Sequence, residues 1–327
     1  MIGRRALLLA LAIGCAPATQ PAVDDAGADV GTDAAVLEPR FADCARCHAT
    51  AARDHASTMH ARAFDDPLFQ REWSARRLSW CVDCHAPLAD DADDPRVHEG
   101  VGCASCHVED GAITSRTASG RAPHRTVAID GFDDAERCGR CHEFDFMERR
   151  RRRPERMQRT LSEWQRSGRS ETCVDCHMPE GSHRLVGARD PALLERSLDV
   201  EVAAERRGRS IVVRASLRVA GAAHAVPTGD LFRNLVFRAT ASGATAEADA
   251  ARVFDRDEDG ARIEIADQRV LPGIERRIEL VLRPRTGAAR VDWSLTWNAL
   301  PPDAADVDGI DESFRTRVIA SGHVRPR

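Results

Sequence analysis

The sequence predicts a multidomain α+β chain, in which a sparse, mainly helical part is followed by an antiparallel β-sandwich-like part. Three observations predict this class. The pattern Cys-x-x-Cys-His occurs five times between Cys44 and His177, with short helical stretches and loops rich in Asp, Pro and Gly between the copies. After residue 197 there is no Cys, and short alternating β-branched segments begin. With 327 residues, the chain is long enough for two domains.

Residues 1–15 are typical of an export signal, because Arg4 and Arg5 precede an apolar run that is too short to span a bilayer. The run ends at Gly14-Cys15, as in a bacterial lipoprotein signal, so we expect Cys15 to carry a lipid anchor. Ordinary cleavage near Ala16-Pro17-Ala18, which would remove Cys15, is the alternative. Either signal predicts an exported protein of the periplasm or cell envelope.

Residues 16–40 consist largely of Ala, Asp, Gly, Thr and Pro, with almost no apolar periodicity. Such a segment cannot bury enough apolar surface to fold. We therefore expect a flexible acidic tether.

Residues 41–196 contain the five motifs, and Cys-x-x-Cys-His is the attachment signature of c-type haem. Two thiols a turn apart can add to the two vinyl groups of one porphyrin, and the following imidazole then binds the iron. The sequence thus predicts five covalent haem c groups. Their cysteines are Cys44, Cys47, Cys81, Cys84, Cys103, Cys106, Cys138, Cys141, Cys173 and Cys176, and their axial ligands are His48, His85, His107, His142 and His177.

Three other interpretations explain less of the pattern. A zinc ribbon would use paired Cys-x-x-Cys motifs such as Cys81/Cys84 and Cys103/Cys106, but it leaves the following His unexplained five times. A thioredoxin-like site needs one such motif at a strand-to-helix turn, not five. Structural disulfides would suit an exported chain, but they do not require a neighbouring His.

Within the motif region we expect short helices at Pro67–Leu78 and Pro154–Ser167. The arginine run Arg149–Arg153 could neutralise haem propionates or dock an acidic redox partner. A solvated helix start is the alternative for that run.

Residues 197–327 are expected to form the sandwich. The turn within Asp255–Gly260 lacks the Glu at its twelfth loop position that a calcium-binding EF-hand requires, so a hairpin between Val253 and Ile263 is expected. The expected strands are Leu198–Ala204, Ser210–Val219, Leu231–Ser242, Ala250–Phe254, Arg262–Ile265, Arg276–Leu282, Arg290–Trp297 and Thr316–His323.

The remaining histidines are candidate distal ligands. Five irons need at most five more ligands, and seven histidines lie outside the motifs, which favours six-coordinate bis-His haems. Met59 or Met178 could instead ligate one iron. The seven are His55, His60, His98, His124, His183, His224 and His323.

Three stretches resemble the multihaem c-type cytochromes that include the tetrahaem electron carrier of ammonia oxidisers and its relatives. They are Thr58-Met59-His60-Ala61, Glu163-Trp164 leading to the fifth motif, and His224-Ala225-Val226-Pro227-Thr228-Gly229. The resemblance implies that His60, His183, His224, His124 and His98 are distal ligands, and that His55 and His323 are not. If His224 is a ligand, the β-domain is a lid over the haems.

We therefore expect an exported electron carrier that exchanges electrons with redox protein partners and binds the membrane through Cys15. The alternative is a reductase or oxidase of small nitrogen or sulfur compounds at one open haem, most plausibly the one that His98 would cap. A third possibility is that the β-domain binds a partner. A net charge of -5 gives no reason to expect nucleic acid.

Overall fold

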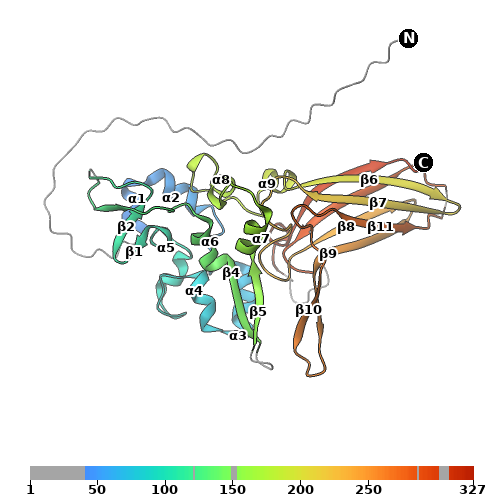
Figure 1. Cartoon of the computed structure of the whole chain (residues 1–327). Helices are drawn as coiled ribbons and strands as arrows, with labels where there is room; N and C mark the ends of the chain where they lie inside the picture. The colour runs from blue at the N-terminus through green and yellow to red at the C-terminus, as the bar shows by residue number, and fades with distance from the viewer. Residues whose placement is uncertain (1–40, 121, 149–152, 286, 302–308) are drawn as a thin grey trace, which may run out of the picture.

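The computed structural model describes residues 41–327, apart from residues 121, 149–152, 286 and 302–308 (Figure 1). The predicted signal (1–15) with its lipid anchor at Cys15 and the predicted tether (16–40) lie outside the described residues. In the described part of the chain, no helix has both the length and the apolar character needed to cross a membrane.

The motif region (residues 41–197) consists mostly of short helices joined by loops (Figure 1). Short 3-10 turns lie at Ser79–Cys81, Pro95–Glu99 and Pro179–Gly181. The helices are α1 (Phe41–Cys47), α2 (Ala49–Ala56), α3 (Pro67–Arg76), α4 (Val82–His85), α5 (Cys103–His107), α6 (Ala135–His142), α7 (Thr160–Ser167), α8 (Cys173–His177) and α9 (Pro191–Glu195).

The predicted helix Pro67–Leu78 is confirmed as α3, which ends slightly earlier, at Arg76. The Asp66 carboxylate accepts hydrogen bonds from two backbone N–H groups of the first turn, and Pro67 occupies the first helical position, where no N–H is needed. Arg77 adopts a left-handed conformation (φ 44°), which ends the helix.

The predicted helix Pro154–Ser167 is wrong over its first half. Residues Arg153–Arg159 form strand β5, antiparallel to β4 (Glu143–Glu148), and helix α7 begins only at Thr160. Pro154 is tolerated near the start of a strand, and Arg252 from the C-terminal part of the chain donates to two β5 carbonyls. These tertiary contacts outweigh the helix propensity of the segment, which is high apart from Pro154.

A second small sheet in the motif region was not predicted. Strands β1 (Val108–Glu109) and β2 (Ala112–Ser115) form a tight antiparallel pair, and β3 (Thr126–Ala128) runs parallel to β2. The two-residue to four-residue strands are too short to leave a clear alternating pattern in the sequence.

The strand region (residues 198–327) contains two antiparallel sheets that pack face to face (Figure 1). One has the order β10-β9-β8-β12-β13 and the other β11-β7-β6, and α10 (Glu312–Arg315) precedes β13. The strands of this region are β6 (Leu198–Arg207), β7 (Ser210–Val219), β8 (Asn234–Ala241), β9 (Ala244–Arg256), β10 (Arg262–Asp267), β11 (Arg276–Leu282), β12 (Val291–Asn298) and β13 (Thr316–Val324).

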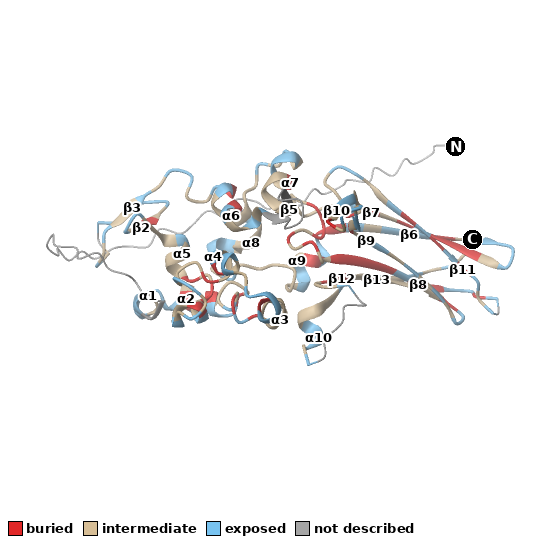
Figure 2. Cartoon of the chain, turned by 90° about the horizontal axis from the view of Figure 1, so that it is seen from below, coloured by how far each residue is buried: buried red, intermediate tan, exposed pale blue. Residues whose placement is uncertain are grey.

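The core of the strand region lies between the two sheets, as the alternation of the strands predicts. Ile211 and Leu217 of β7 face Phe237 of β8 and Leu295 of β12, and all four side chains are fully buried. Figure 2 shows that buried residues concentrate here, whereas most of the motif region is intermediate or exposed. The mixed α+β class with an antiparallel C-terminal part is therefore confirmed.

Strand boundaries differ from prediction where the sequence lacks β-branched residues. Strand β9 starts at Ala244, well before the predicted start at Ala250, because its alanine-rich first half pairs in register with β8. The predicted hairpin between Val253 and Ile263 is confirmed: β9 and β10 are antiparallel, and Gly260 at their turn has a positive φ of 74°.

Candidate functional site

Each of the five motifs forms a turn of helix that places its two cysteines on the same side, three residues apart. The helix stops at or just before the His because the next residue leaves the helical conformation, as Ala86 does with a φ of -152°. The imidazoles therefore stand at helix C-terminal ends. Helices α4, α5, α6 and α8 end at His85, His107, His142 and His177, and α1 ends at Cys47, directly before His48.

Thiols of different motifs lie in hydrogen-bond contact, and none of the ten is in a disulfide. The bond between Cys84 and Cys141 raises the pKa of Cys84 and lowers the pKa of Cys141 to about 7. Corresponding contacts join Cys138 to Cys173 and Cys44 to Cys103. The second motif therefore lies beside the fourth, the fourth beside the fifth, and the first beside the third.

Four motif imidazoles each face a histidine from elsewhere in the chain. Two iron–nitrogen bonds of about 2 Å, plus roughly 1 Å from each nitrogen to its ring centre, separate the rings of a bis-His haem by ~6 Å. The four ring-centre separations match this spacing. They are 6.3 Å for His48 and His124, 6.1 Å for His60 and His142, 6.0 Å for His107 and His183, and 6.2 Å for His177 and His224.

Backbone carbonyls orient several of these rings. A donor bond from Nδ1 to a carbonyl leaves Nε2 deprotonated and fixes the ring plane, as is typical of metal-binding histidines. The Nδ1 atoms of His60 and His124 are buried without a hydrogen-bond partner. Bonds of this kind join His85 to Ala63 (2.8 Å), His107 to Thr114 (3.0 Å), His177 to Val186 (2.6 Å) and His224 to Ala225 (2.9 Å).

Four of the facing imidazoles have a lowered pKa, and for each of them burial is the largest cause: His60, His142, His183 and His224. For His60, burial and then repulsion by the nearby His55 and His177 lower the pKa to about 4. For His142, desolvation by the surrounding protein, followed by repulsion from His60, lowers the pKa to about 4. In these four side chains the neutral imidazole, which is the form that binds iron, is therefore favoured near neutral pH.

The structure pairs His85 with no other imidazole in the described part of the chain. The ring of Phe69 stacks on it at 3.8 Å and 16°. Near that ring, Phe64, Trp73, Val82, Ala86 and Val97 form the small buried cluster of the motif region. The motif region therefore contains five Cys-x-x-Cys-His turns but four facing imidazole pairs.

His98, which was predicted to be a distal ligand, does not lie opposite a motif imidazole. Its side chain is 68% exposed, and Nδ1 lies 2.9 Å from the Asp65 carboxylate. His55 is buried with Nε2 2.8 Å from the Val101 carbonyl, and His323 is exposed on β13. Met59 Sδ lies 2.8 Å from a nitrogen of Arg189.

The His224 segment is held by a network that crosses from the motif region to the strand region. Glu163 of α7 accepts hydrogen bonds from the Ala225 N–H, from the Thr228 hydroxyl and from Arg269. Glu163 and Arg269 are both buried. In the sequence, Glu163 stands out only through the resemblance to multihaem cytochromes, and no pattern points to Arg269. Glu163 is the buried residue of α7.

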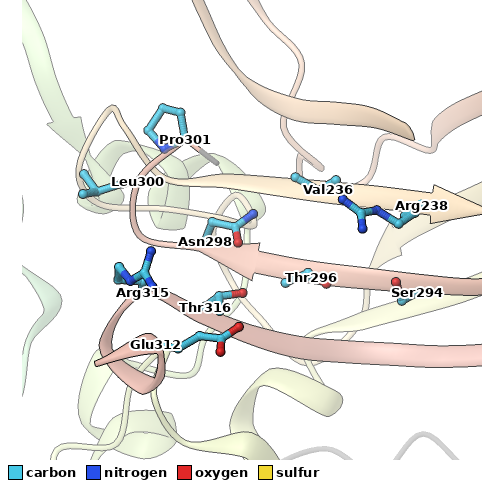
Figure 3. Close-up of a pocket in the computed structure, with 10 residues that line it drawn as sticks. All are labelled: Val236, Arg238, Ser294, Thr296, Asn298, Leu300, Pro301, Glu312, Arg315 and Thr316. Atoms are coloured by element: carbon cyan, nitrogen blue, oxygen red, sulfur yellow. The ribbon is translucent and has the colours of Figure 1, made fainter. Parts of the chain in front are cut away.

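A cleft of about 340 Å³ lies on the five-stranded sheet, away from the motifs (Figure 3). Its lining comes from β8, β12, β13 and α10 and includes Arg238, Ser294, Glu312 and Arg315. It contains no Cys and no His, so it lacks the chemistry of the motif region.

The residues of the motif region fit haem c. Each motif offers two thiols on one helical face, four imidazole pairs stand at the spacing of an axial pair, and the orphaned Nδ1 atoms of His60 and His124 belong to two of those pairs. All ten motif cysteines and the ten predicted ligand histidines are described by the structure, and only His85 and His98 are outside the facing pairs.

Two comparisons with known proteins found similarities. Residues 43–108 match the family model "Cytochrome c554 and c-prime". The fold resembles the crystal structure of a penta-heme cytochrome c552 from Thermochromatium tepidum, with a TM-score of 0.72 and 20% identity over 86% of this chain and 97% of that one. A match to the Fcho1 Mu homology domain of Danio rerio with bound Eps15 peptide has a TM-score of 0.17 and 10% identity and covers 41% of this chain and 44% of that one.

No curated protein matches the sequence. The family match covers the first three motifs, whereas the similarity in fold extends over both the motif region and the strand region. Together with the five motifs, these similarities support a multihaem c-type cytochrome.

Proposed function

We propose that this protein is an exported cytochrome that conducts electrons between redox protein partners through five covalently bound haem c groups. Bound haem c supplies an iron that exchanges one electron between its ferrous and ferric states. The four imidazole pairs at 6.0–6.3 Å are the observation that carries the proposal. An iron capped by imidazoles on both faces transfers electrons and does not admit substrate.

Contacts between the motifs support a continuous route. The first motif contacts the third through Cys44 and Cys103. Arg137 of α6 donates to the Cys106 carbonyl at 2.7 Å and thereby joins the third motif to the fourth. The thiol contacts described above join the fourth motif to both the second and the fifth. We infer a branched arrangement of the haems. The first lies next to the third, the third lies next to the fourth, and the second and fifth both lie next to the fourth.

The position of His224 supports the interpretation that the strand region covers the haems as a lid. His224 follows β7 and faces His177 of the fifth motif, so the proposed ligand set of that haem comes from both parts of the chain. In this proposal the pentahaem domain (41–196) and the sandwich domain (197–327) work as one unit. Cys15 would anchor the unit to a bacterial membrane.

The unpaired His85 favours a second candidate function. Its Nδ1–H donates to the Ala63 carbonyl, as in the other oriented motif imidazoles, but no distal imidazole faces it in the described residues. We therefore propose that this haem keeps one face open to a small ligand, which would permit reduction or oxidation of a small nitrogen or sulfur compound. The open position differs from the all-bis-His arrangement that the sequence favours.

Mass spectrometry of the mature protein tests the count of five haems. Electron paramagnetic resonance of the oxidised protein then distinguishes the two functions: four low-spin haems and one high-spin haem support the open position. A mass with fewer than five haems contradicts the main proposal. Turnover of nitrite or hydroxylamine with a viologen dye tests the enzyme, and its absence leaves electron transfer as the function.

A further inference from the structure

The buried carboxylate of Glu163 lies next to a proposed haem ligand without being one. Glu163 belongs to α7 of the motif region, and its side chain is 3% exposed. Its Oε2 atom accepts from the backbone N–H of Ala225, the residue directly after His224, at 3.2 Å. The same oxygen accepts from the hydroxyl of Thr228 at 2.7 Å. One carboxylate oxygen therefore holds the segment on both sides of Val226 and Pro227.

The other oxygen of Glu163 is held from the strand region. Arg269, which is 4% exposed, donates from Nη2 to Oε1 of Glu163 at 2.6 Å and from Nη1 to the Pro227 carbonyl at 3.1 Å. Asp267 accepts two further hydrogen bonds from Arg269, at 2.9 and 2.8 Å, which fixes the guanidinium. A buried charge needs such partners, since an unpaired one is strongly unfavourable in the interior.

The network reaches the ring of His224 through Ala225. The Ala225 N–H is bound by Glu163, and the Ala225 carbonyl accepts from Nδ1 of His224 at 2.9 Å. That second bond determines which ring nitrogen is free and which way it points. The ring of His224 then lies nearly parallel to the ring of His177, at 12° and 6.2 Å.

We propose that Glu163 is a positioning residue that holds His224 at the spacing required of the distal ligand of the fifth haem, with Arg269 and Thr228 completing its support. The inference rests on the proposed ligation of that haem by His177 and His224. The inference gives Glu163 of α7 a role in haem ligation, because His224 of the strand region keeps its position only while α7 is packed against that region.

The substitution Glu163→Gln tests the role while nearly conserving volume. The amide has one acceptor oxygen where the carboxylate has two, so its NH₂ group must face either Arg269 or the donors of the His224 segment. We expect His224 to leave the iron in part of the molecules, which raises the high-spin ferric fraction by up to one haem in five. Free imidazole should reverse this increase, and the midpoint potential of one haem alone should change.

Two further variants serve as the positive and the negative control for Glu163→Gln. His224→Ala should raise the high-spin fraction by a full haem in five. Glu275→Gln is the control, since in the described part of the chain Glu275 forms its ion pairs with Arg218 and Arg277 of the strand region and not with α7 or the His224 segment. It should leave the spin states unchanged.

The outcomes separate the two proposals. No spectral change in His224→Ala would mean that the proposed ligation is wrong. A change in His224→Ala with none in Glu163→Gln overturns the positioning role alone. If Glu163→Gln does not yield folded protein, Thr228→Val decides: it removes one hydrogen bond to Glu163, and a smaller, imidazole-reversible high-spin fraction supports the role, whereas unchanged spectra overturn it.

Discussion

The ring of Phe69 lies 3.8 Å from the ring of His85 and is nearly parallel to it, so the second motif presents its imidazole against an aromatic side chain. Phe69 in turn stacks on Trp73 at 12°. The four other motif imidazoles instead face a second histidine ring. This difference singles out the second motif within a set of otherwise similar helical turns.

The second haem is expected to bind an external ligand. Cyanide or imidazole added to the oxidised protein should convert one high-spin haem in five to low spin, because His85 has no facing imidazole in the described residues. His98→Ala is the control: it should change neither the spectrum nor the ligand affinity, since His98 is exposed and bound to Asp65. A fully low-spin protein that gains a high-spin haem in His98→Ala would show that His98 caps this iron.

Replacement of His124 by Ala should make the first haem high-spin. His124 faces His48 at 6.3 Å from the segment just before β3, and an Ala side chain cannot reach the iron. The expected change is one haem in five by electron paramagnetic resonance. His323→Ala, which removes an exposed His from β13, should leave all five haems as they are; an identical effect of both variants would argue against the His48–His124 pair.

The contact between the two parts of the chain should depend on Arg252. Its side chain is 3% exposed and donates to the carbonyls of Met157 and Arg156 at 2.7 and 2.6 Å. Arg252→Ala leaves these β5 carbonyls without their donor, which we expect to lower the free energy of unfolding by about 1–3 kcal/mol. Thermal unfolding measures this change, and the exposed Arg290→Ala should cost no more than ~1 kcal/mol.

The same interface should weaken in acid. Burial alone would raise the pKa values of Glu264 and Asp267, but their bonds to Arg252 and Arg269 outweigh it, and both pKa values are lowered. A carboxyl with a lowered folded-state pKa stabilises the fold at pH values above its unfolded pKa of about 4, and this stability is lost as the pH falls through the folded value.

Unfolding midpoints between neutral pH and pH ~3 test this expectation, because the unfolded pKa values lie near 4. Glu264→Gln should flatten the dependence below pH ~4, since it removes one of the two titrating groups. A dependence as steep as that of the unsubstituted protein would place the acid-sensitive groups elsewhere.

The candidate site was predictable where the chemistry is local. The spacing of Cys-x-x-Cys-His alone places the two thiols and the imidazole, since residues three apart share a helical face and the His follows at the helix end. The strands with β-branched alternation, such as Ser210–Val219 and Arg276–Leu282, were likewise predicted with the bounds that the structure has. The segment Arg153–Arg159 was not, because its strand conformation depends on β4 and on Arg252.

The motif cysteines, the histidine after each pair and the strands of the sandwich could be read from the sequence, because each is encoded by spacing or alternation within one short segment. Which histidines face one another depends on the tertiary fold, since His48 faces His124 and His177 faces His224 across long stretches of chain. The tertiary fold also left His98 at the surface and brought Glu163 to Ala225. Such pairings follow from packing between segments, which no local pattern records.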